Sequence, residues 1–505
     1  MFNRFLVVTI ILFTFLVNSS AQEFNIRNRY ALLSGAWYSA FELNNEPYVA
    51  GIAAHGYFSN YAVQLFFLKQ SSDTIFNPAF LYQPDSSSWF YPNPVSIGKQ
   101  NQIIISGGYG SGYPSKKCFF MKCDSDFHIK NLSTFEDSSK RTNLFVHATS
   151  IDNGYLCLSV FQKKFENVKE DFAIYKLDEF GDTIWTRDYI QPVGYSLIAQ
   201  RIATFRNGYL IGGALNDIAA HFYNQSPKLF FTDTSGNLLW QRVLDDSIDG
   251  IHDWVINDDH SIVYCSKWGD SISQSQNLYT RAYLAKLDSN QNKVWEYRMG
   301  LSTLGTSYEA ITKTKDGSYI AVGTGVSLPT DSGFRGTLIK FKDRGDSISI
   351  QWQRYYRAVT PKISVNFLYD VIERSNGSIV ACGKSECYTD TFPQQGWILG
   401  LDSFGCLVPG CQNWNAIEDM PAMAQLRLYP NPVQSALYFD VSGIGNKKDC
   451  MVTISDGSGR QLAHIPAIDA ATEYIADTKN YAPGIYFLKL YDHDQLLHVA
   501  RFVKE

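Results

Sequence analysis

A tryptophan recurs at a nearly constant interval through the middle of the chain, with successive spacings of 55, 55 and 57 residues. Each follows a short turn-like segment that begins with aspartate. The tryptophans are Trp185, Trp240, Trp295 and Trp352, and the aspartates are Asp178, Asp233, Asp288 and Asp343. A repeat of this length, with strand-like segments and one aromatic landmark per unit, is typical of a radial or stacked β-array. Such architectures host unrelated activities, so the repeat constrains the fold far more than the function.

A second landmark precedes each aspartate turn. Asn-Gly or Asp-Gly between two apolar runs indicates a tight hairpin, because both turn residues must take positive φ. Clear or recognisable copies begin at Asn153, Asn207, Asp259, Asp316 and Asn376, and weaker ones at Asn45 and Gln100. Each unit is therefore predicted to hold four short strands. Seven such units predict an all-β fold, a seven-bladed β-propeller of four-stranded blades over residues 22–411.

The two ends of the repeat array complement each other. The seventh unit stops after Asp402 without a tryptophan strand, while residues 24–30 stand before the first unit and resemble the segment from Trp185 to Tyr189. We expect residues 24–30 to pair beside the strand at 397–402 and to remove the open edges of the array. An open stack of sheets is the alternative, and this complementarity favours a closed ring.

The first 21 residues have the composition of a secretory signal peptide. Arg4 precedes an apolar run from Phe5 to Val17, and small residues end at Ala21. The run is shorter than the ~20 residues needed for a membrane anchor. We expect cleavage before Gln22, export from the cytoplasm, and no transmembrane segment in the mature protein.

Nine cysteines are spread over the chain, and an exported protein permits disulfides. Cys406–Cys411 is the most credible pair, because Pro and Gly turn the chain between the two sulfurs. Cys382–Cys387 could close a similar loop. Cys118 and Cys123 lie five apart in an apparent strand, so their side chains should face opposite ways and a local bridge is disfavoured. No Cys-x-x-Cys pair supports a zinc site.

The repeat ends at Cys411, and a different module follows. Residues 412–424 form an irregular linker, and residues 425–505 contain alternating apolar and polar segments separated by turn residues. This pattern predicts a small C-terminal β-sandwich.

The last module resembles the type A C-terminal sorting domain of the bacterial type IX secretion system. The matching residues are Tyr429, Pro430, Asn431 and Pro432 at its start, Asp456, Gly459 and Arg460 in its middle hairpin, and Pro483, Gly484 and Tyr486 before its last strands. The resemblance implies that the type IX secretion machinery is a partner. It also implies passage across both membranes of a Gram-negative cell, removal of residues 425–505, and release or surface attachment of the rest.

No recognisable catalytic motif occurs, and we expect no cofactor and no metal site. Asp288 to Asn292 has part of the oxygen spacing of a calcium loop, but it lacks the Gly and the closing Glu and occupies an ordinary aspartate turn. His252 beside Asp253, and the segment Asp258 to His260, could form acid–base pairs but are interpreted as solvated turns. A formal charge of −5 and a pI near 6.0 argue against nucleic-acid binding.

The tryptophans could be sugar platforms, but their strict recurrence favours packing between neighbouring sheets. The second turn of each unit is more informative for function. In a four-stranded antiparallel sheet the first and third turns lie on one side, and the second turn lies on the other with the connections between sheets. The long, irregular segments all fall on this second-turn side: 53–60, 107–116, 160–171, 214–227, 266–281, 324–336 and 384–396.

Variable loops on a rigid scaffold commonly bind ligands. The candidate binding residues are the aromatic and arginine side chains of these loops: Tyr57, Tyr109, Tyr113, Phe222, Tyr223, Trp268, Tyr279, Arg335 and Tyr388. The leading hypothesis is a non-enzymatic propeller that binds an extracellular glycan or protein with this side. The rival is a secreted polysaccharide-active hydrolase or lyase, whose carboxylates converge from different blades and leave no linear motif.

Overall fold

A computed structural model gives the fold of the chain. It describes residues 25–28, 33–55, 62–72, 75–82, 88–89, 95–109, 117–164, 169–218, 225–244, 249–272, 278–299, 305–325, 334–358, 364–387, 394–407, 425–442, 450–457, 460–465, 474–492 and 495–505. The chain divides into two compact units, with the main boundary between Pro409 and Gly410. The larger unit and the C-terminal unit are treated separately below.

The larger unit contains seven antiparallel sheets over its described residues, and in most of them consecutive strands pair in chain order. The first sheet is β2 (Leu33–Leu43), β3 (Glu46–His55), β4 (Ala62–Ser72) and β5 (Ile75–Tyr82). The second is β6 (Ser88–Trp89), β7 (Val95–Ile97), β8 (Ile103–Tyr109), β9 (Lys117–Cys123) and β10 (Ile129–Glu136). The third is β11 (Lys140–Ile151), β12 (Gly154–Lys163), β13 (Asp171–Leu177) and β14 (Thr183–Tyr189). The fourth is β15 (Tyr195–Phe205), β16 (Gly208–Asp217), β17 (Gln225–Asp233) and β18 (Leu238–Val243).

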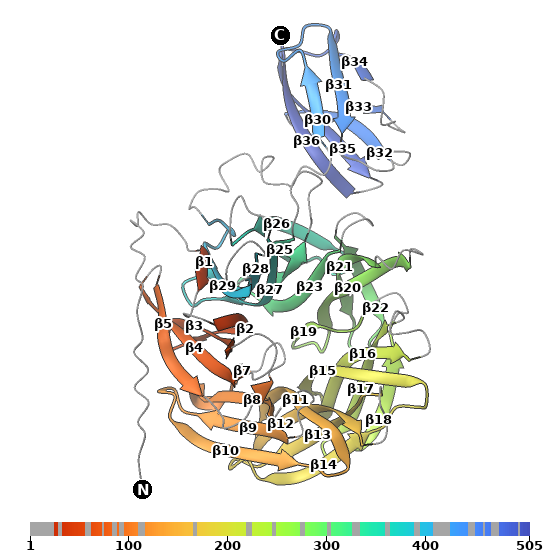
Figure 1. The fold of residues 1–505 in the computed structure, drawn as a ribbon. Helices are drawn as coiled ribbons and strands as arrows, with labels where there is room; N and C mark the ends of the chain where they lie inside the picture. Colours follow the sequence, from red (N-terminus) through yellow and green to blue (C-terminus); the bar gives the residue numbers. More distant parts are fainter. Residues whose placement is uncertain are drawn as a thin grey trace. The chain divides into compact units, whose positions relative to one another are not determined.

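The remaining three sheets of this unit follow the same order. The fifth is β19 (Asp253–Ile256), β20 (Ile262–Ile272), β21 (Leu278–Leu287) and β22 (Lys293–Arg298). The sixth is β23 (Ser307–Lys313), β24 (Tyr319–Gly325), β25 (Arg335–Asp343) and β26 (Ile348–Tyr356). The seventh is β27 (Val365–Glu373), β28 (Ile379–Glu386), β29 (Gln394–Leu401) and, from the start of the chain, β1 (Asn25–Asn28). In Figure 1 the first strands of the sheets lie toward the middle of the unit, and the labelled outer strands such as β5, β10, β14 and β18 lie on its outside.

The predicted pairing between the two ends of the array is confirmed. Strand β1 pairs antiparallel with β29, from Asn25 opposite Leu399 to Asn28 opposite Gly396. The N-terminal strand thereby takes the fourth position of the last sheet and covers an edge that would otherwise be unpaired. Strand β27 of this sheet also contacts β2 of the first.

The second sheet departs from the four-strand expectation because its first strand is split. Strands β6 and β7 both pair with β8 at different points. The sequence between them contains Pro92 and Pro94. Proline has no N–H to donate to a β ladder, so this sequence disfavours a continuous first strand.

The aspartate turns are built as predicted, from the side chain of the aspartate itself. Asp178 Oδ1 accepts hydrogen bonds from the backbone N–H groups of Phe180 and Asp182, both at 2.9 Å. Asp288 makes the same pair of bonds at 2.8 Å, which confirms the predicted turn at that position. Equivalent bonds occur at Asp124, Asp233 and Asp402. This oxygen geometry is therefore a repeating turn cap.

Two of the predicted Asn-Gly hairpins are displaced by one residue. The two-residue loops are Asp152–Asn153 and Arg206–Asn207, and the glycines that follow begin the next strand. Close approach of the third strand explains the glycines. A Cβ on Gly154 would lie 2.0 Å from the Leu177 carbonyl oxygen, and one on Gly208 would lie 1.8 Å from that of Thr232.

The recurring tryptophans pack between neighbouring sheets, as predicted. Trp295 and Trp352 are buried in cores that combine residues of two successive sheets, and Trp185 and Trp240 pack against equivalent cores. The Trp295 indole also donates a hydrogen bond to Asp343 at 3.1 Å, in the aspartate turn of the next sheet. The tryptophan that recurs in the third to sixth sheets is thus structural.

Lysines of the third strands reinforce these contacts. Lys122 Nζ donates to the Glu179 carbonyl oxygen at 2.6 Å, and Lys286 Nζ pairs with the Asp343 carboxylate at 2.6 Å. Each lysine belongs to one sheet, and its acceptor belongs to the aspartate turn of the next. The first- and third-turn side of the unit is therefore occupied by repeated structural bonds.

The cysteines follow the predictions in part. Cys406 is disulfide-bonded, and its predicted partner Cys411 lies outside the described residues. The suggested bridge from Cys382 to Cys387 is wrong, because Cys382 is a buried free thiol in the middle of β28. Cys118 and Cys123 belong to different cores on opposite faces of β9, which explains why they form no local bridge.

The C-terminal unit contains two antiparallel sheets that share one core. The first is β30 (Gln425–Tyr429), β31 (Ala436–Ser442) and β34 (Tyr474–Asp477), and the second is β33 (Gln461–Ile465), β32 (Cys450–Asp456), β35 (Gly484–Asp492) and β36 (Gln495–Lys504). Buried side chains from both sheets, among them Phe439, Ile454 and Phe502, form that core. Nowhere in the described parts of the chain is there a helix with the length and apolarity needed to span a membrane.

Candidate functional site

Most of the nine residues predicted to bind a ligand lie where the structure gives no side-chain description. Tyr57, Tyr113, Phe222, Tyr223 and Tyr388 lie outside the described residues, and Tyr109 and Tyr279 are placed only as strand positions in β8 and β21.

Trp268 and Arg335 are described, and they belong to different surroundings. Trp268 lies in β20, packs against the core between the fourth and fifth sheets, and has the Arg298 guanidinium 4.1 Å from its ring centre. Arg335 begins β25 in the following sheet. Of the predicted set, these two remain candidates without a common site.

The first strands of the sheets, which we call the inner strands, share a β-bulge in several of the sheets. Several of them contain one extra residue that interrupts the pairing with the second strand. The extra residues are Tyr38, Val146, Gln200, Glu309 and Tyr369. A β-bulge re-aims side chains and strengthens the local twist, and bulges are frequent next to functional sites.

Polar residues that follow four of these bulges, together with the first residue of β19, connect successive sheets. We call them the interlock residues: Ser39, His147, Arg201 and Asp370 after the bulges, and Asp253 in β19. Asp370 Oδ2 accepts from the Ala40 N–H at 2.9 Å, which joins the seventh sheet to the first. The other bonds run from Val95 N–H to Ser39 Oγ (3.4 Å), Ile202 N–H to His147 Nδ1 (3.3 Å), Arg201 Nε to Asp253 Oδ1 (2.7 Å) and Ile311 N–H to Asp253 Oδ2 (3.0 Å). These polar side chains hold the inner strands together.

The protonation of two interlock residues suits this role. Burial and the nearby Arg201 charge lower the pKa of His147 to about 3, so the ring is neutral and its Nδ1 can accept the Ile202 N–H. Burial raises the pKa of Asp370 to about 7, although the bonds from Ala40 and Val371 favour its charged form. Neither residue is needed to explain ligand binding.

A second polar cluster lies beside the interlock, on the second-turn side; we call it the His252 group, comprising Asp249, His252, Lys267, Ser307 and Glu309. It joins the start of β19, the latter half of β20 and the start of β23. His252 Nε2 lies 3.2 Å from Asp249 Oδ2, and its Nδ1 lies 2.8 Å from the Tyr308 carbonyl oxygen and 3.4 Å from Glu309 Oε2. Lys267 Nζ lies 2.7 Å from the same Asp249 oxygen, and Ser307 Oγ donates to Glu309 Oε1 at 2.6 Å.

The surroundings of His252 favour an imidazolium. Both ring nitrogens face acceptors that carry no hydrogen, so a neutral ring could donate to only one of them. Burial acts to lower the pKa of His252, but the Glu309 and Asp249 carboxylates outweigh it, and the pKa is raised. Burial likewise acts to raise the pKa of Asp249, but His252 and Lys267 hold it below its usual range.

The prediction of a solvated turn at His252 is therefore wrong. The residue is buried by the next sheet, which brings Tyr308 and Glu309 over it from 56 and 57 residues along the chain. The same prediction for Asp258 to His260 is confirmed as a turn, because Asp259 Oδ1 accepts from the Ser261 N–H at 2.9 Å and His260 has a φ of 62°.

Aromatic side chains from the first and seventh sheets continue the lining. The rings of Tyr38 and Tyr369, the bulged residues of β2 and β27, are 5.3 Å apart, and Phe367 stacks on Tyr369 at 6.1 Å. Burial is the main cause that raises the pKa of Tyr369, and the Glu309 and Glu386 carboxylates act in the same direction. Lys384 forms an ion pair with Glu386 at 2.6 Å. The bulge thus places Tyr369 within the field of two carboxylates from different sheets.

The sequence analysis missed these residues because no linear motif joins them. One signal could have found some of them. Glu309 and Tyr369 are separated by 60 residues, close to one repeat, and both precede the first hairpin of their unit. Alignment of the repeats on those hairpins would place them at one structural position with different side chains.

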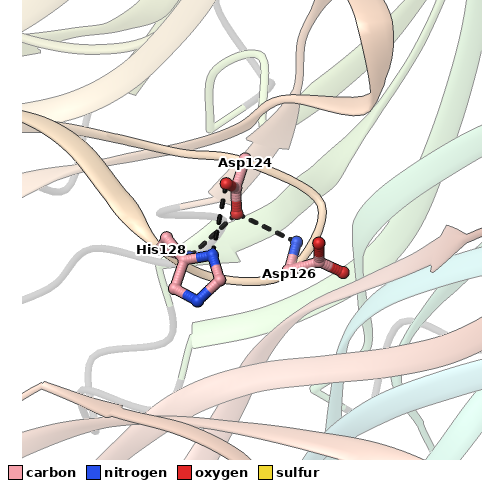
Figure 2. A group of neighbouring side chains, drawn as sticks. All are labelled: Asp124, Asp126 and His128. Atoms are coloured by element: carbon pink, nitrogen blue, oxygen red, sulfur yellow. Dashed lines mark hydrogen bonds and ion pairs between the residues drawn. The ribbon is translucent and has the colours of Figure 1, made fainter.

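A group of potential metal ligands lies on the opposite side, in the turn after β9. Figure 2 shows Asp124, Asp126 and His128, which could place ligand atoms within 4.8 Å of one another. Asp124 Oδ1 already caps the turn by accepting from the Asp126 and His128 N–H groups, and its Oδ2 pairs with Lys130 Nζ at 2.8 Å. The arrangement is that of the other aspartate turns, and the Lys130 ammonium group already pairs with the carboxylate oxygen that a metal ion would use.

The sorting-motif residues have mainly structural roles in the C-terminal unit. Asn431 bonds the last strand twice, donating to the Arg501 carbonyl oxygen at 3.1 Å and accepting from the Val503 N–H at 2.9 Å. Tyr486 is buried against Phe502, and its hydroxyl donates to the Ala482 carbonyl oxygen at 2.7 Å. Tyr429 is exposed and stacks on Tyr438.

The other motif positions are less informative. Pro430, Pro432 and Pro483 are exposed, and Gly484 begins β35. Gly459 lies outside the described residues. The described residues of the motif therefore lie at turns and form bonds between strands of this small domain.

Comparison with known families agrees with this assignment of the tail. Residues 427–505 match the model of the secretion system C-terminal sorting domain. These residues form such a domain, as the resemblance predicted. Comparison with curated proteins gave no match.

Among solved structures, the larger unit has distant likenesses. A protein of unknown function from Dyadobacter fermentans is 11% identical with a TM-score of 0.43, over 76% of this chain and 98% of that chain. The β-propeller domain of the Trilobed protease from Pyrococcus furiosus is 11% identical with a TM-score of 0.40, over 72% and 93%. An α-L-arabinofuranosidase from Fusarium graminearum is 10% identical with a TM-score of 0.36, over 76% and 98%.

Proposed function

We propose that this chain is an exported β-propeller of seven four-stranded blades. In this proposal it binds an extracellular glycan or protein on its second-turn side and does not catalyse a reaction of that ligand. In this proposal residues 1–21 are a signal peptide, residues 22–411 the propeller, residues 412–424 a linker and residues 425–505 a β-sandwich sorting domain. The sheet order and the contact of β27 with β2 support a closed ring. The core shared by the two C-terminal sheets supports the sandwich.

One observation carries the binding proposal. The two sides of the larger unit differ in what their polar side chains do. On the first- and third-turn side, aspartates and lysines repeat and are used for turn capping and contacts between sheets. On the second-turn side, the His252 group and the Tyr38–Tyr369 pair come from four sheets, differ from sheet to sheet, and are additional to the interlock residues. Non-repeating polar and aromatic groups gathered on a repeating scaffold are typical of a binding surface.

The sorting domain gives the destination. A domain of this family indicates export of the chain to the cell surface or the medium. We propose the type IX machinery as the partner that handles residues 425–505, with passage through the periplasm of a Gram-negative cell and subsequent surface attachment or release.

A polysaccharide-active hydrolase or lyase is the second candidate. The observation in its favour is that the Glu309 and Glu386 carboxylates, from different sheets, both lie close enough to Tyr369 to raise its pKa. Paired carboxylates are the usual machinery of glycoside hydrolysis. Against it, the carboxylate of the His252 group that shows a shifted pKa, Asp249, is shifted downward, whereas a general acid needs an upward shift.

The test combines binding and turnover. Mature protein is applied to glycan and protein arrays, and in parallel it is incubated with polysaccharides whose reducing ends and unsaturated products are measured. We expect capture by at least one immobilised ligand, loss of capture in the double variant Glu309→Gln, Tyr369→Ala, and no product. Product release in proportion to the protein concentration would show that the chain is an enzyme rather than a binding protein. Ligand capture that persists in the double variant would show that the binding site lies elsewhere.

A further inference from the structure

The described charged side chains of the His252 group and those beside the Tyr38–Tyr369 pair form ion pairs with one another. Three carboxylates, Asp249, Glu309 and Glu386, lie among three cations, His252, Lys267 and Lys384. The ion pairs join them at 2.6 to 3.4 Å, and the acceptors at both ring nitrogens of His252 favour its charged form. The charges of a polyanion or polycation bound at these side chains would compete with ion pairs that already exist.

The same side chains have capacity for hydroxyl groups. A carboxylate offers about four acceptor positions, and Glu309, partly exposed, is contacted by Ser307 and His252. It is the extra residue of the β23 bulge and has no opposite residue in β24. Hydroxyl groups donate to such carboxylates without adding charge, which an ammonium or a carboxylate ligand cannot do.

The aromatic rings supply the complementary surface. Tyr38, Phe367 and Tyr369 are partly exposed and form a continuous set, with ring separations of 5.3 and 6.1 Å. Burial and the Glu386 charge raise the pKa of Tyr38 to about 12, so its hydroxyl stays protonated at physiological pH. Such rings present an apolar face for C–H groups and a polar edge for hydrogen bonds.

A protein partner fits this surface less well. The cores of protein–protein interfaces are depleted in charged residues, and the centre of this surface consists of ion-paired Asp, Glu, Lys and His side chains. Burying them under a protein would require desolvation of several pairs at once, which is costly. A small, hydroxyl-rich ring can instead contact them while water remains at the margins.

We propose that the second-turn side takes an uncharged, hydroxyl-rich saccharide, with one sugar ring on Tyr38 and Tyr369 and its hydroxyl groups donated to Glu309 and Glu386. This inference rests on the proposed function and names the ligand class for the same site.

The test is affinity electrophoresis of the full mature chain in native gels that contain one polysaccharide each. The probes are three neutral polymers (laminarin, arabinan and galactomannan), one polyanion (alginate) and one polycation (chitosan). We expect retardation by at least one neutral polymer. We expect an apparent dissociation constant about tenfold higher in Glu309→Gln and in Tyr369→Ala, and an intermediate effect in Tyr369→Phe, which keeps the ring.

A matched control lies on the opposite side of the unit. Glu46 is a partly exposed glutamate paired with Lys69 in the first sheet, and Glu46→Gln should leave retardation unchanged. Tryptophan fluorescence of each variant establishes that it is folded.

The alternative outcomes separate the two proposals. Retardation by alginate or chitosan alone, or neutral retardation that Glu309→Gln and Tyr369→Ala leave intact, would overturn the ligand class while leaving a binding protein. Capture of a protein on the arrays without retardation in any gel would do the same. Absence of every interaction on arrays and gels would overturn the proposed function itself.

Discussion

The carboxylate of Asp370 should be essential for joining the seventh sheet to the first. It is the only interlock residue among those described that connects these two sheets, with Oδ2 accepting from Ala40 N–H at 2.9 Å and Oδ1 from Val371 N–H at 2.8 Å. Ala40 and Val371 are buried, so Asp370→Ala leaves two N–H groups without an acceptor in the protein. A buried donor without a partner costs about 1–3 kcal/mol.

Two such donors would cost about 2–6 kcal/mol of the free energy of unfolding. We expect about 2–4 kcal/mol, because Asp370 is only partly buried and water can replace part of the hydrogen bonding. With a urea slope of about 3 kcal/mol/M, the unfolding midpoint should fall by about 1 M. Asp370→Asn keeps one acceptor oxygen but places an amide nitrogen opposite the other N–H. Its urea midpoint should therefore lie between those of the natural protein and of Asp370→Ala. Asp152→Ala, at an aspartate whose side chain is 99% exposed, is the control and should leave the midpoint unchanged.

Tryptophan fluorescence is a suitable probe, because nine of the ten tryptophans precede the boundary at Gly410 and none lies within residues 425–505. Measurement at several pH values adds a second check. The pKa of Asp370 is raised to about 7 from an ordinary value of 3.8, so its contribution to stability is fully present below about 4 and is lost as the pH rises through about 7. Asp370→Ala should remove that loss. If its midpoint matched that of Asp152→Ala at every pH, Asp370 would not contribute to joining the seventh sheet to the first.

Further predictions concern other parts of the chain. Trp295→Ala should cost about 3–5 kcal/mol because the indole is buried between two sheets, and an unchanged urea midpoint would contradict the packing role. The pKa of His147 is lowered to about 3, so the neutral ring contributes stability above the unfolded-state pKa of 6.5, and this contribution is lost as the pH falls toward 3. The difference in urea midpoint between the natural protein and His147→Gln should therefore shrink on acidification. A constant difference would argue against a neutral imidazole that accepts a hydrogen bond. Deletion of residues 22–30 should expose the edge of β29 and lower both solubility and melting temperature, whereas equal values would mean that β1 adds no stability. Residues 22–411 alone should remain folded yet accumulate in the periplasm of the native host, and efficient surface delivery of this truncated protein would mean that the tail is not a sorting signal.

The sequence by itself determined the features that depend on neighbouring residues. Alternating strands, turn-capping aspartates such as Asp178, one packing tryptophan per repeat and the sorting motif around Tyr429 were all readable, because period-2 patterning and turn chemistry act over a few residues. Pairing of residues 25–28 with β29 was also predictable, since one end of the repeat lacked a strand and the other supplied one.

Only the tertiary structure decided which polar side chains meet on the second-turn side. A single bulged residue reverses the direction of every side chain that follows in a strand, and no local pattern announced the bulges at Tyr38, Glu309 and Tyr369. His252 changes from an apparent loop residue to a largely covered side chain with a raised pKa, because Glu309 and the Tyr308 carbonyl oxygen arrive from the next sheet. Side-chain direction and charge environment in this fold are set by the register between strands and by the contact between sheets, and neither is encoded within one repeat.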